Sequence, residues 1–460
     1  MTDHQIPTSG GDKNDVVAWL KDRNITEIEC MVPDMAGVAR GKILPTKKFL
    51  SGFTEGALRL PESIFGQTVT GDYIDESSVL SETEPDVILM PDPATLRIVP
   101  WYDEPTAQVI CDAVTREGEP VTLAPRTVLR HVLDLYAAQG WKPVVAPELE
   151  FFLAAKNIDP DYPLEAPVGA NGRQETGRQS YSIDAVNEFD PIFEDMYDFC
   201  EAQEIDIDTL IHESGVAQVE INFNHGDPMA LADQVFLFKR TMRQAAMRHG
   251  IYATFMAKPY EREPGSSMHI HQSLVSAQTG KNLFATKGGR DTKLFHHHIG
   301  GLQKFLPAAM SLIAPNVNSY RRIVKWYAAP INTHWGVENR TVGLRVPLSK
   351  PEDRRIENRV AGADANPYLA IATSLACGYL GMVGELKPSK PKESAAYDSK
   401  IFALPKHLLD ALAKLQSNKE LREILGEDFI TVYLEVKHTE HDAYQGVISA
   451  WEREHLLLNV

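Results

Sequence analysis

This 460-residue sequence has few cysteines, no glycine-rich nucleotide-binding motif and no long hydrophobic run. Its four cysteines are far apart and form no C-x-x-C pair, so we expect reduced thiols inside the fold. The patterns G-x-x-x-x-G-K-[ST] and G-x-G-x-x-G do not occur, which argues against P-loop and Rossmann nucleotide sites. The most apolar stretch, residues 368–383, contains Thr373, Ser374 and Gly378 and is too short and too mixed for a membrane helix.

Basic side chains are also fewer than acidic ones. The chain has 46 Lys and Arg against 63 Asp and Glu, a formal net charge of −17. Such a balance argues against nucleic acid or anionic membranes as partners and is compatible with a cationic ligand. Residues 1–16 are polar and lack the apolar core of a signal peptide. We therefore expect a cytoplasmic protein whose substrates are small molecules.

The pattern of elements predicts an α+β protein with two domains. Residues 1–13 are rich in Gly and Asp and are expected to be disordered. Residues 14–115 are expected to form a small strand-rich domain, with a helix near 15–24 and strands near 25–32, 38–44 and 108–114. Residues 116–460 alternate short strands with long helices and form the larger domain. Its clearest helices are expected at residues 188–203, 229–248, 367–386 and 439–458.

Ionisable side chains recur in segments that are typical of strands. Residues two apart on a strand share a face, so each such pair points into one space. Two carboxylates on one face of an apolar strand favour a bound cation, because unpaired buried charges are costly. The residues concerned are Glu148 and Glu150, Glu213 and Glu220, His269 and His271, and the run Arg355, Glu357 and Arg359.

Five carboxylates with imidazoles and no thiolate form a ligand set suited to Mg²⁺ or Mn²⁺. Arginines lie nearby in the sequence, at Arg322, Arg340, Arg345, Arg355 and Arg359. A polyphosphate bridged by divalent ions is therefore the expected ligand, and phosphoryl transfer the expected chemistry. Two simpler interpretations stay open for single motifs: an exposed strand face for the Glu pair, and zinc for the His pair.

Specific motifs resemble those of type I glutamine synthetases from about residue 14 to residue 460. They are Pro147-Glu148-Leu149-Glu150-Phe151-Phe152, Gly265 to His271 with Ser273, Asn318-Ser319-Tyr320-Arg321-Arg322, Asn339-Arg340-Thr341, and Arg355 to Arg359 followed by Asn366-Pro367-Tyr368. The resemblance implies a small β-grasp-like N-terminal domain and a large α/β catalytic domain. It also implies a homo-oligomer, a dodecamer of two hexameric rings with active sites between neighbouring subunits.

The resemblance also assigns roles to individual residues. Two or more Mg²⁺ or Mn²⁺ ions per site are implied, one held by Glu150, Glu213 and Glu220, the other by Glu148, His269 and Glu357. ATP, a co-substrate, would contact His271, Ser273, Arg345, Arg355 and, through its base, Phe223. L-glutamate would contact Gly265, Arg322 and Arg359, while Arg340 and Arg359 would stabilise the transferring phosphoryl group.

Three positions depart from the ammonia-using members of the family. Ala328 stands where they carry a flap Glu, and the stretch Arg59 to Ile64 lacks the loop Asp that the neighbouring subunit supplies. Phe402 replaces the tyrosine that is adenylylated in enteric-type enzymes, so we expect that regulation to be absent. Loss of both acids removes the ammonium site and leaves room for a larger amine.

The departures resemble γ-glutamylpolyamine synthetases, ligases of polyamine catabolism. We expect ATP-dependent ligation of the glutamate γ-carboxylate to a primary amine, putrescine or another polyamine, through γ-glutamyl phosphate. Glu62 is a candidate for binding or deprotonating the amine, which has a pKa near 10 when free. Trp326, Ala328 and Trp335 complete the expected amine pocket, although tryptophans also pack in cores.

Other functions remain open at this point. The chain could ligate a short monoamine such as ethanolamine or isopropylamine, or could be an ordinary ammonia-using glutamine synthetase. A different phosphotransferase with the same catalytic fold is a further alternative. A non-catalytic family member would be expected to lose metal ligands, yet all six matching positions keep Glu or His.

Overall fold

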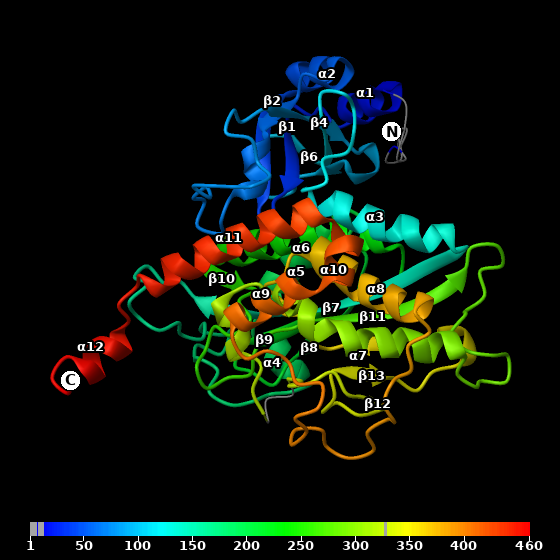
Figure 1. Cartoon of the computed structure of the whole chain (residues 1–460). Coiled ribbons are helices and arrows are strands. Elements are labelled where there is room, and N and C mark those ends of the chain that lie inside the picture. The colour runs from blue at the N-terminus through cyan, green and yellow to red at the C-terminus, as the bar shows by residue number, and fades with distance from the viewer. Residues whose placement is uncertain (1–6, 8–12, 326–328) are drawn as a thin grey trace.

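The computed structural model describes residue 7 and residues 13–325 and 329–460. The chain forms an upper part around one sheet and a larger lower part around a second sheet (Figure 1). The expected disorder of residues 1–13 concerns residues that lie almost wholly outside the described ones, since the first helix begins at Lys13.

The first sheet belongs to the N-terminal part of the chain. Its strand order is β2-β1-β6-β4-β3, with β5 paired to β6, and the β1–β6 pair is parallel. The strands are β1 (Glu27–Pro33), β2 (Ala39–Pro45), β3 (Arg59–Pro61), β4 (Asp86–Pro91), β5 (Arg97–Ile98) and β6 (Thr106–Val114). The helical segments are α1 (Lys13–Asp22), α2 (Thr46–Glu55), η1 (Glu62–Gly66) and η2 (Pro93–Thr95). A β-grasp-like domain ending near residue 115 remains a prediction.

The second sheet is mostly antiparallel and has the order β12-β13-β14-β11-β7-β9-β8, with β10 paired to β7. Its long central strand is β7 (Trp141–Ala155), whose pattern of apolar residues matches the expected strand near residues 144–152. The other strands are β8 (Ile207–His212), β9 (Gln218–Phe223), β10 (Ile251–Thr254), β11 (Met268–Ser276), β12 (Trp335–Val337), β13 (Leu344–Val346) and β14 (Ile356–Asn358).

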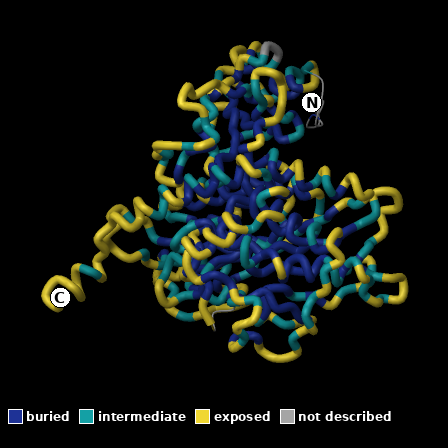
Figure 2. The backbone as a smooth tube through the Cα atoms, viewed as in Figure 1, coloured by how far each residue is buried: buried dark blue, intermediate teal, exposed yellow. Residues whose placement is uncertain are grey.

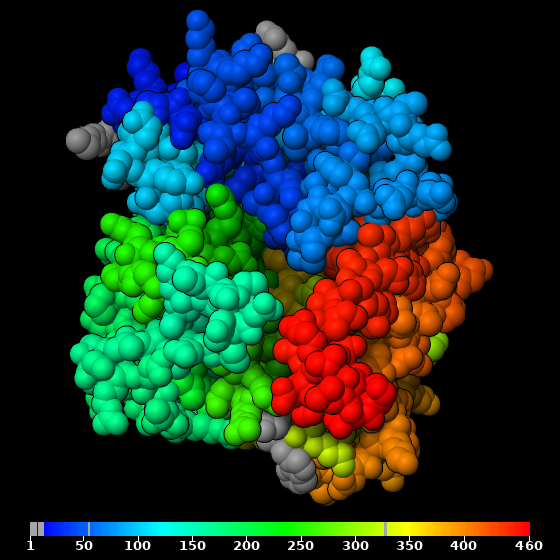
Figure 3. All heavy atoms as spheres, turned by 90° about the vertical axis from the view of Figure 1, so that its left-hand side faces the viewer, coloured from blue at the N-terminus to red at the C-terminus, as the bar shows by residue number. Residues whose placement is uncertain are grey.

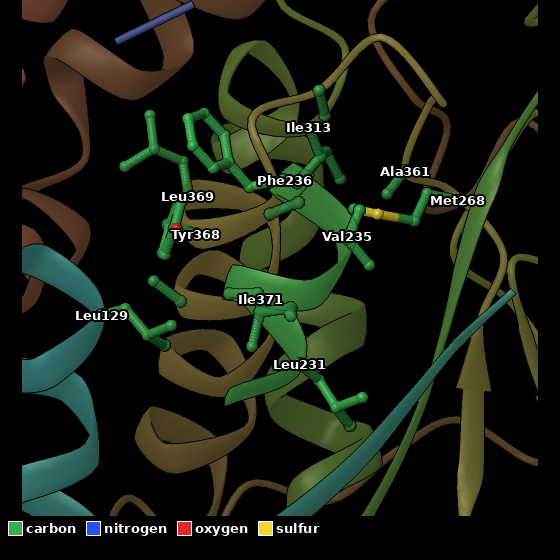
Figure 4. Packing of buried hydrophobic residues seen from close by; sticks show 14 of the residues in the cluster. Leu129, Leu231, Val235, Phe236, Met268, Ile313, Ala361, Tyr368, Leu369 and Ile371 are labelled. Carbon is green, nitrogen blue, oxygen red and sulfur yellow. The ribbon is translucent and has the colours of Figure 1, made fainter. Parts of the chain in front are cut away.

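Helices cover one face of this sheet. The long ones are α3 (Pro125–Ala138), α5 (Asp190–Ala202), α6 (Pro228–Arg248), α7 (Lys293–Ile313), α8 (Pro367–Val383) and α11 (Glu427–Gln445). The shorter ones are α4 (Ile183–Asn187), α9 (Leu408–Ser417), α10 (Lys419–Leu425), α12 (Ala450–Leu456), η3 (Val317–Arg321) and η4 (Pro351–Asp353). Figure 4 shows α6 and α8 packing through Val235, Phe236 and Ile371, with Met268 of β11 against them.

The alternation of side chains along β7 separates core from site. Leu149 and Phe151 are fully buried, and the Phe151 ring lies 6.2 Å from that of Phe238 in α6. Their neighbours Glu148 and Glu150 therefore point to the opposite face, since consecutive strand residues alternate. Figure 2 shows buried backbone in the interior of both parts of the molecule and exposed backbone at the periphery. The acidic residues thus gather on the face of β7 opposite Phe238 of α6.

A buried arginine joins the two parts of the molecule. Arg126, at the start of α3, donates to Asp92 and Asp112 of the N-terminal part and to both carboxylate oxygens of Asp233 in α6. Tyr368 donates a further hydrogen bond to Asp233 at 2.6 Å. Since the arginine is only 2% exposed, this network is desolvated and fixes the first sheet relative to the helical layer.

The C-terminal segment differs from its expected structure. The prediction of one helix over residues 439–458 is wrong, because α11 ends at Gln445 and α12 begins at Ala450. Ser449 and Glu452 form a capping box that starts a new helix. The segment projects away from the body of the molecule (Figure 1). Separately, none of the described helices combines the length and apolarity that crossing a lipid bilayer requires.

Candidate active site

The strand registers of the second sheet bring the sequence-predicted acids together. Glu150 of β7 lies opposite Glu220 of β9, and Glu148 lies opposite His269 of β11. Glu357 of β14 lies opposite His271 on the other side of β11. Four strands thus place these ionisable side chains in one region of the sheet.

Glu213 reaches the same region from a turn. It directly follows β8, and its backbone N–H donates to the Gln218 carbonyl at the start of β9. The β8–β9 hairpin therefore places Glu213 near Glu220, although the two are seven positions apart. Here the structure differs from the expectation that each acid lies within a strand.

Three groups of ligand atoms are close enough to share metal ions. Glu150, Glu213 and Glu220 form one group, the set expected for the first ion, with ligand atoms within 4.8 Å of one another. The other groups are Glu148, Glu220 and His269, and Glu148, His271 and Glu357. The second expected set is thus divided between two overlapping groups. His269 Nδ1 still lies 3.3 Å from Glu148 and 3.7 Å from Glu357.

Two of these carboxyls hold their protons unusually strongly. Burial raises the pKa of Glu220 to about 9, and the charges of Glu148 and Glu150 contribute to the rise. Burial, followed by the charge of Glu213, raises the pKa of Glu150 to about 8, although Ser267 donates hydrogen bonds that oppose the shift. The protein's own positive charges therefore do not balance the negative charges that Glu150, Glu213 and Glu220 would carry if all three were ionised.

The neighbouring carboxyls are stabilised as anions. Burial opposes ionisation of Glu148, but hydrogen bonds with His269 and His271 outweigh it and lower its pKa. Burial also opposes ionisation of Glu357, yet Arg359 and the two histidines lower its pKa to about 2. Burial and then Arg359 lower the pKa of His269, which favours the neutral imidazole that ligates metals.

This donor set fits hard divalent cations. It consists of carboxylate oxygens with imidazole nitrogens, and the four cysteines are buried elsewhere. Oxygen-rich sites of this kind suit Mg²⁺ or Mn²⁺. The raised pKa values of Glu150 and Glu220 indicate that a cation bound beside them would stabilise their ionised carboxylates.

A cavity of about 530 Å³ opens beside the carboxylates and contains most of the expected ATP contacts. Phe223, His271, Ser273 and Arg355 all line it. His271 joins the cavity to the acidic group, because its Nε2 lies 2.7 Å from Glu148 while its Nδ1 accepts from Arg355 at 3.1 Å. The volume and mixed lining suit a nucleotide-sized molecule.

A second cavity, of about 390 Å³, contains the expected glutamate and phosphoryl contacts. Its lining includes Gly265, Arg322, Arg340, Arg345 and Arg359. A side chain at position 265 would place its Cβ 2.4 Å from the Ala257 carbonyl oxygen, so only glycine fits there.

Arg345 occupies this second cavity rather than the first. It donates to Glu357 at 2.7 Å and also contacts Glu338 at 3.3 Å. The two cavities share Glu148 and Asn222 in their linings, so they meet at the carboxylate cluster. Molecules bound in the two cavities would thus face each other across the cluster.

Several residues of the second cavity were missed from the sequence. Tyr181 and Ser180 come from the long loop before α4, and Asn222, Gln218 and Ser267 come from or beside the strands. Tyr181 has a φ of 64°, an uncommon conformation for a side chain of this size, and it is largely exposed. Its place on the cavity wall depends on long-range folding of the loop, and no sequence motif marks it.

Two expected amine-pocket residues lie apart from both cavities in the single chain. Glu62 is the first residue of η1 in the N-terminal part, half-buried. Trp335 is 5% exposed, its indole N–H donates to the Ser389 carbonyl at 2.8 Å, and its ring packs near His296. These contacts give Trp335 a packing role, so we leave it out of the amine pocket. Trp326 and Ala328 lie outside the described residues.

Comparison with known proteins gives one consistent family. The model described as "Glutamine synthetase, catalytic domain" matches residues 122–456. The chain is 34% identical to gamma-glutamylputrescine synthetase PuuA of Escherichia coli (strain K12), covering 95% of this chain and 92% of that protein. It is 32% identical to glutamate–isopropylamine ligase of a Pseudomonas species, covering 94% and 95%.

Solved structures agree. The structure titled "Apo GmaS without ligand" matches with a TM-score of 0.81 and 27% identity, covering 96% of this chain and 99% of that one. The sequence match extends over most of the chain, and the fold match includes both sheets. The chain therefore belongs to the glutamine synthetase family of ligases.

Proposed function

We propose that this protein ligates the γ-carboxylate of L-glutamate to a primary amine at the expense of ATP. The observation that carries the proposal is the meeting of two cavities at one carboxylate cluster. A nucleotide in one cavity and an amino acid in the other would face each other across bound cations. The names of two relatives, a gamma-glutamylputrescine synthetase and a glutamate–isopropylamine ligase, support the same reaction class.

The first step transfers the γ-phosphoryl group of ATP to the glutamate carboxylate. Glu150, Glu213 and Glu220 would hold one divalent ion, and Glu148, His269 and Glu357 another. When bound, such ions neutralise phosphate charge and align the reacting oxygens.

The protein's own cations act on the same step. Arg340 and Arg359 line the glutamate cavity and would balance charge that develops on the phosphoryl oxygens. Arg359 also forms a hydrogen bond with Glu357, which fixes the direction of its guanidinium. Arg322 is 3% exposed and would hold the substrate carboxylate in a place from which water is excluded.

The second step joins the amine to the acyl group. The neutral amine nitrogen attacks the carbonyl carbon of γ-glutamyl phosphate, the C–O bond to phosphate breaks, and the nitrogen loses a proton. A primary alkylamine has a pKa near 10, so it arrives as a cation and must be deprotonated first. Glu62 of a neighbouring subunit is the group that we assign to binding or deprotonating it.

We infer that the amine is putrescine or another polyamine. The sequence has Ala328 where ammonia-using members of the family carry a flap Glu, so an acid expected to hold ammonium is missing. Tyr181 offers an exposed aromatic face on the wall of the glutamate cavity, beside Glu213, which suits an alkylammonium chain. A monoamine is the second candidate, favoured by the isopropylamine-ligating relative.

Phosphate release by the purified enzyme with ATP, Mg²⁺ and glutamate tests the proposal. The amine panel contains ammonium, putrescine, spermidine, ethanolamine and isopropylamine. Strong stimulation by putrescine or spermidine with little from ammonium is expected. Preference for a monoamine would retain the reaction and change the amine, whereas turnover with ammonium alone would contradict our interpretation of Ala328. No turnover with any amine would favour a non-catalytic protein.

A further inference from the structure

A separate cavity lies between the N-terminal part and the catalytic part. It measures about 470 Å³, and none of its described lining residues belongs to the two cavities at the carboxylate cluster. Its walls come from the β1–β2 turn, α6, β10, the segment after α7, and α11. Figure 3 shows a hollow on this face of the molecule, where the dark-blue, green and orange-red parts of the chain meet.

Positive charge dominates the lining of this cavity, although the whole chain has a net charge of −17. Among the described residues, its cations are Lys239, Arg240, Arg243 and Lys437, and its carboxylate is Asp364. Two of the cations have acidic partners just outside the lining. Arg240 pairs with Glu29 and Lys437 with Glu440, each at 2.7 Å.

The other two cations have no carboxylate partner among the residues that the structure describes. Lys239 is 8% exposed, and its Nζ donates to the Ala365 carbonyl at 2.8 Å. Arg243 lies one helical turn further along α6, on the same face. Both charged groups sit over the ring of Phe255, at 5.7 Å and 5.2 Å from its centroid. The two charged groups therefore meet at the same aromatic ring.

A single carboxylate faces these two cations in the described lining. Asp364 accepts hydrogen bonds from Asn316 and Ser319 at 2.8 Å and 2.5 Å. Burial, with a contribution from Arg243, lowers the pKa of Lys239 to about 7, and the charge of Asp364 opposes this shift without cancelling it. Burial likewise lowers the pKa of Arg243. Both shifts mean that an anion in the cavity would be stabilising.

We propose that this cavity binds a small organic molecule through a phosphate monoester group. Two unpaired cations suit one doubly charged group, and a guanidinium with an ammonium supplies several donors to phosphate oxygens. The cavity is larger than a phosphate needs, and Phe236, Phe255 and Pro315 offer apolar contact to an organic part. The site lies outside the ligase cavities and is independent of the reaction proposed above.

Calorimetric titration of the full-length enzyme with phenyl phosphate and with inorganic phosphate tests the site. Phenyl phosphate should bind more tightly, because its ring can contact the apolar wall. The double variant K239M/R243Q should bind phenyl phosphate about tenfold more weakly or worse, as expected for lost charge-assisted hydrogen bonds. R248Q is the matched control, since Arg248 lies on the same helix, is exposed and does not line the cavity. Its affinity should be unchanged.

Equal affinity in the wild type, the double variant and R248Q would overturn the proposal, because the ligand would then bind elsewhere, for instance among the active-site arginines. R243Q alone serves if the double variant does not fold, with the same loss expected. A structure of the complete enzyme with phenyl phosphate gives a readout that needs no variant. Density between Lys239 and Arg243 supports the site, whereas density only in the catalytic cavities, or a partner subunit's side chain filling this one, refutes it.

Discussion

Glu220 lies among the other carboxylates of the active site, and their negative charges act on it. Burial and four other carboxylates, those of Glu148, Glu150, Glu213 and Glu357, all disfavour its ionised form. In the unfolded chain it titrates as an ordinary glutamate. Between the ordinary pKa and about 9, the folded metal-free protein therefore holds a proton that the unfolded chain has lost. The free energy of unfolding must fall as pH rises through this range.

The first prediction concerns metal addition at two pH values. Without divalent ions, Tm should fall between about pH 6 and about pH 8.5, and Mg²⁺ should raise Tm more at the higher pH. The reason is that bound Mg²⁺ needs the deprotonated carboxylates whose ionisation costs stability in its absence. Scanning calorimetry of metal-free enzyme, with and without Mg²⁺, measures this. A shift that is larger at the lower pH would contradict the assignment.

The second prediction is that Glu220→Gln raises the stability of the metal-free protein while it lowers the ligase activity. Glutamine cannot ionise, so the metal-free variant should have a higher Tm above about pH 7 than the wild type. Its ligase rate should fall more than roughly 10–100-fold, which is the loss typical of mutating a residue that only hydrogen-bonds to a metal ligand. Glu201→Gln, an exposed change on α5, is the control and should alter neither quantity. Retained activity would remove Glu220 from the metal site.

Arg126 of α3 connects α6 to the first sheet through its bonds to Asp233 and Asp112. Arg126→Met should destabilise the protein by about 3–5 kcal/mol, because it leaves Asp112 and Asp233 without their buried partner. Arg130→Gln is the matched control: Arg130 also pairs with Asp112 but is 46% exposed, so it should cost about 1 kcal/mol or less. Urea denaturation followed by fluorescence measures both, and equal effects would refute a special role for Arg126.

Element types were predictable where the signal was local. Strand alternation indicated that Glu148 and Glu150 share a face, and the helices expected at residues 229–248 and 367–386 match α6 and α8 within a few residues. The break between α11 and α12 was visible in principle, since Ser449 and Glu452 form a capping box. Apolar residues on both sides concealed it.

Contacts between distant segments could not be read from spacing. Hydrogen bonds of the Arg126 network join residues up to 135 positions apart, and Tyr181 reaches the cavity wall through an irregular loop. Strand register decides that Glu150 faces Glu220, and no local pattern encodes register between strands. The metal-binding roles expected for Glu150 and Glu220 therefore came from the family resemblance rather than from periodicity.

At the scale of the whole molecule, the C-terminal segment leaves several apolar side chains exposed. Trp451 is 63% exposed and Leu458 is 91% exposed on an arm that extends from the body (Figure 1). Exposed apolar groups of this kind mark contacts between chains. We expect removal of residues 447–460 to lower the mass of the oligomer, measured by light scattering. Glu454→Gln on the same arm is the control, and an unchanged mass after truncation would contradict the prediction.

The last prediction asks which subunit supplies Glu62. In one chain it lies on η1 in the N-terminal part, and neither active-site cavity includes it among the described residues. A role with the amine therefore requires a neighbouring subunit's cavity. Burial raises the pKa of Glu62, which suits a group that accepts a proton from an ammonium. Glu62→Gln should raise the KM for putrescine and lower kcat.

Mixed oligomers distinguish action between subunits from action within one. Assemblies of E62Q and E220Q subunits in equal amounts should recover about one quarter of wild-type sites, because an intact cavity then meets an intact Glu62 by chance pairing of neighbours. E62Q mixed with E201Q is the control for assembly and should recover about one half of wild-type sites, since every cavity keeps Glu220 and half of the cavities face a neighbour that carries Glu62. Activity equal to the mean of the two separate variants would place Glu62 outside the neighbouring active site.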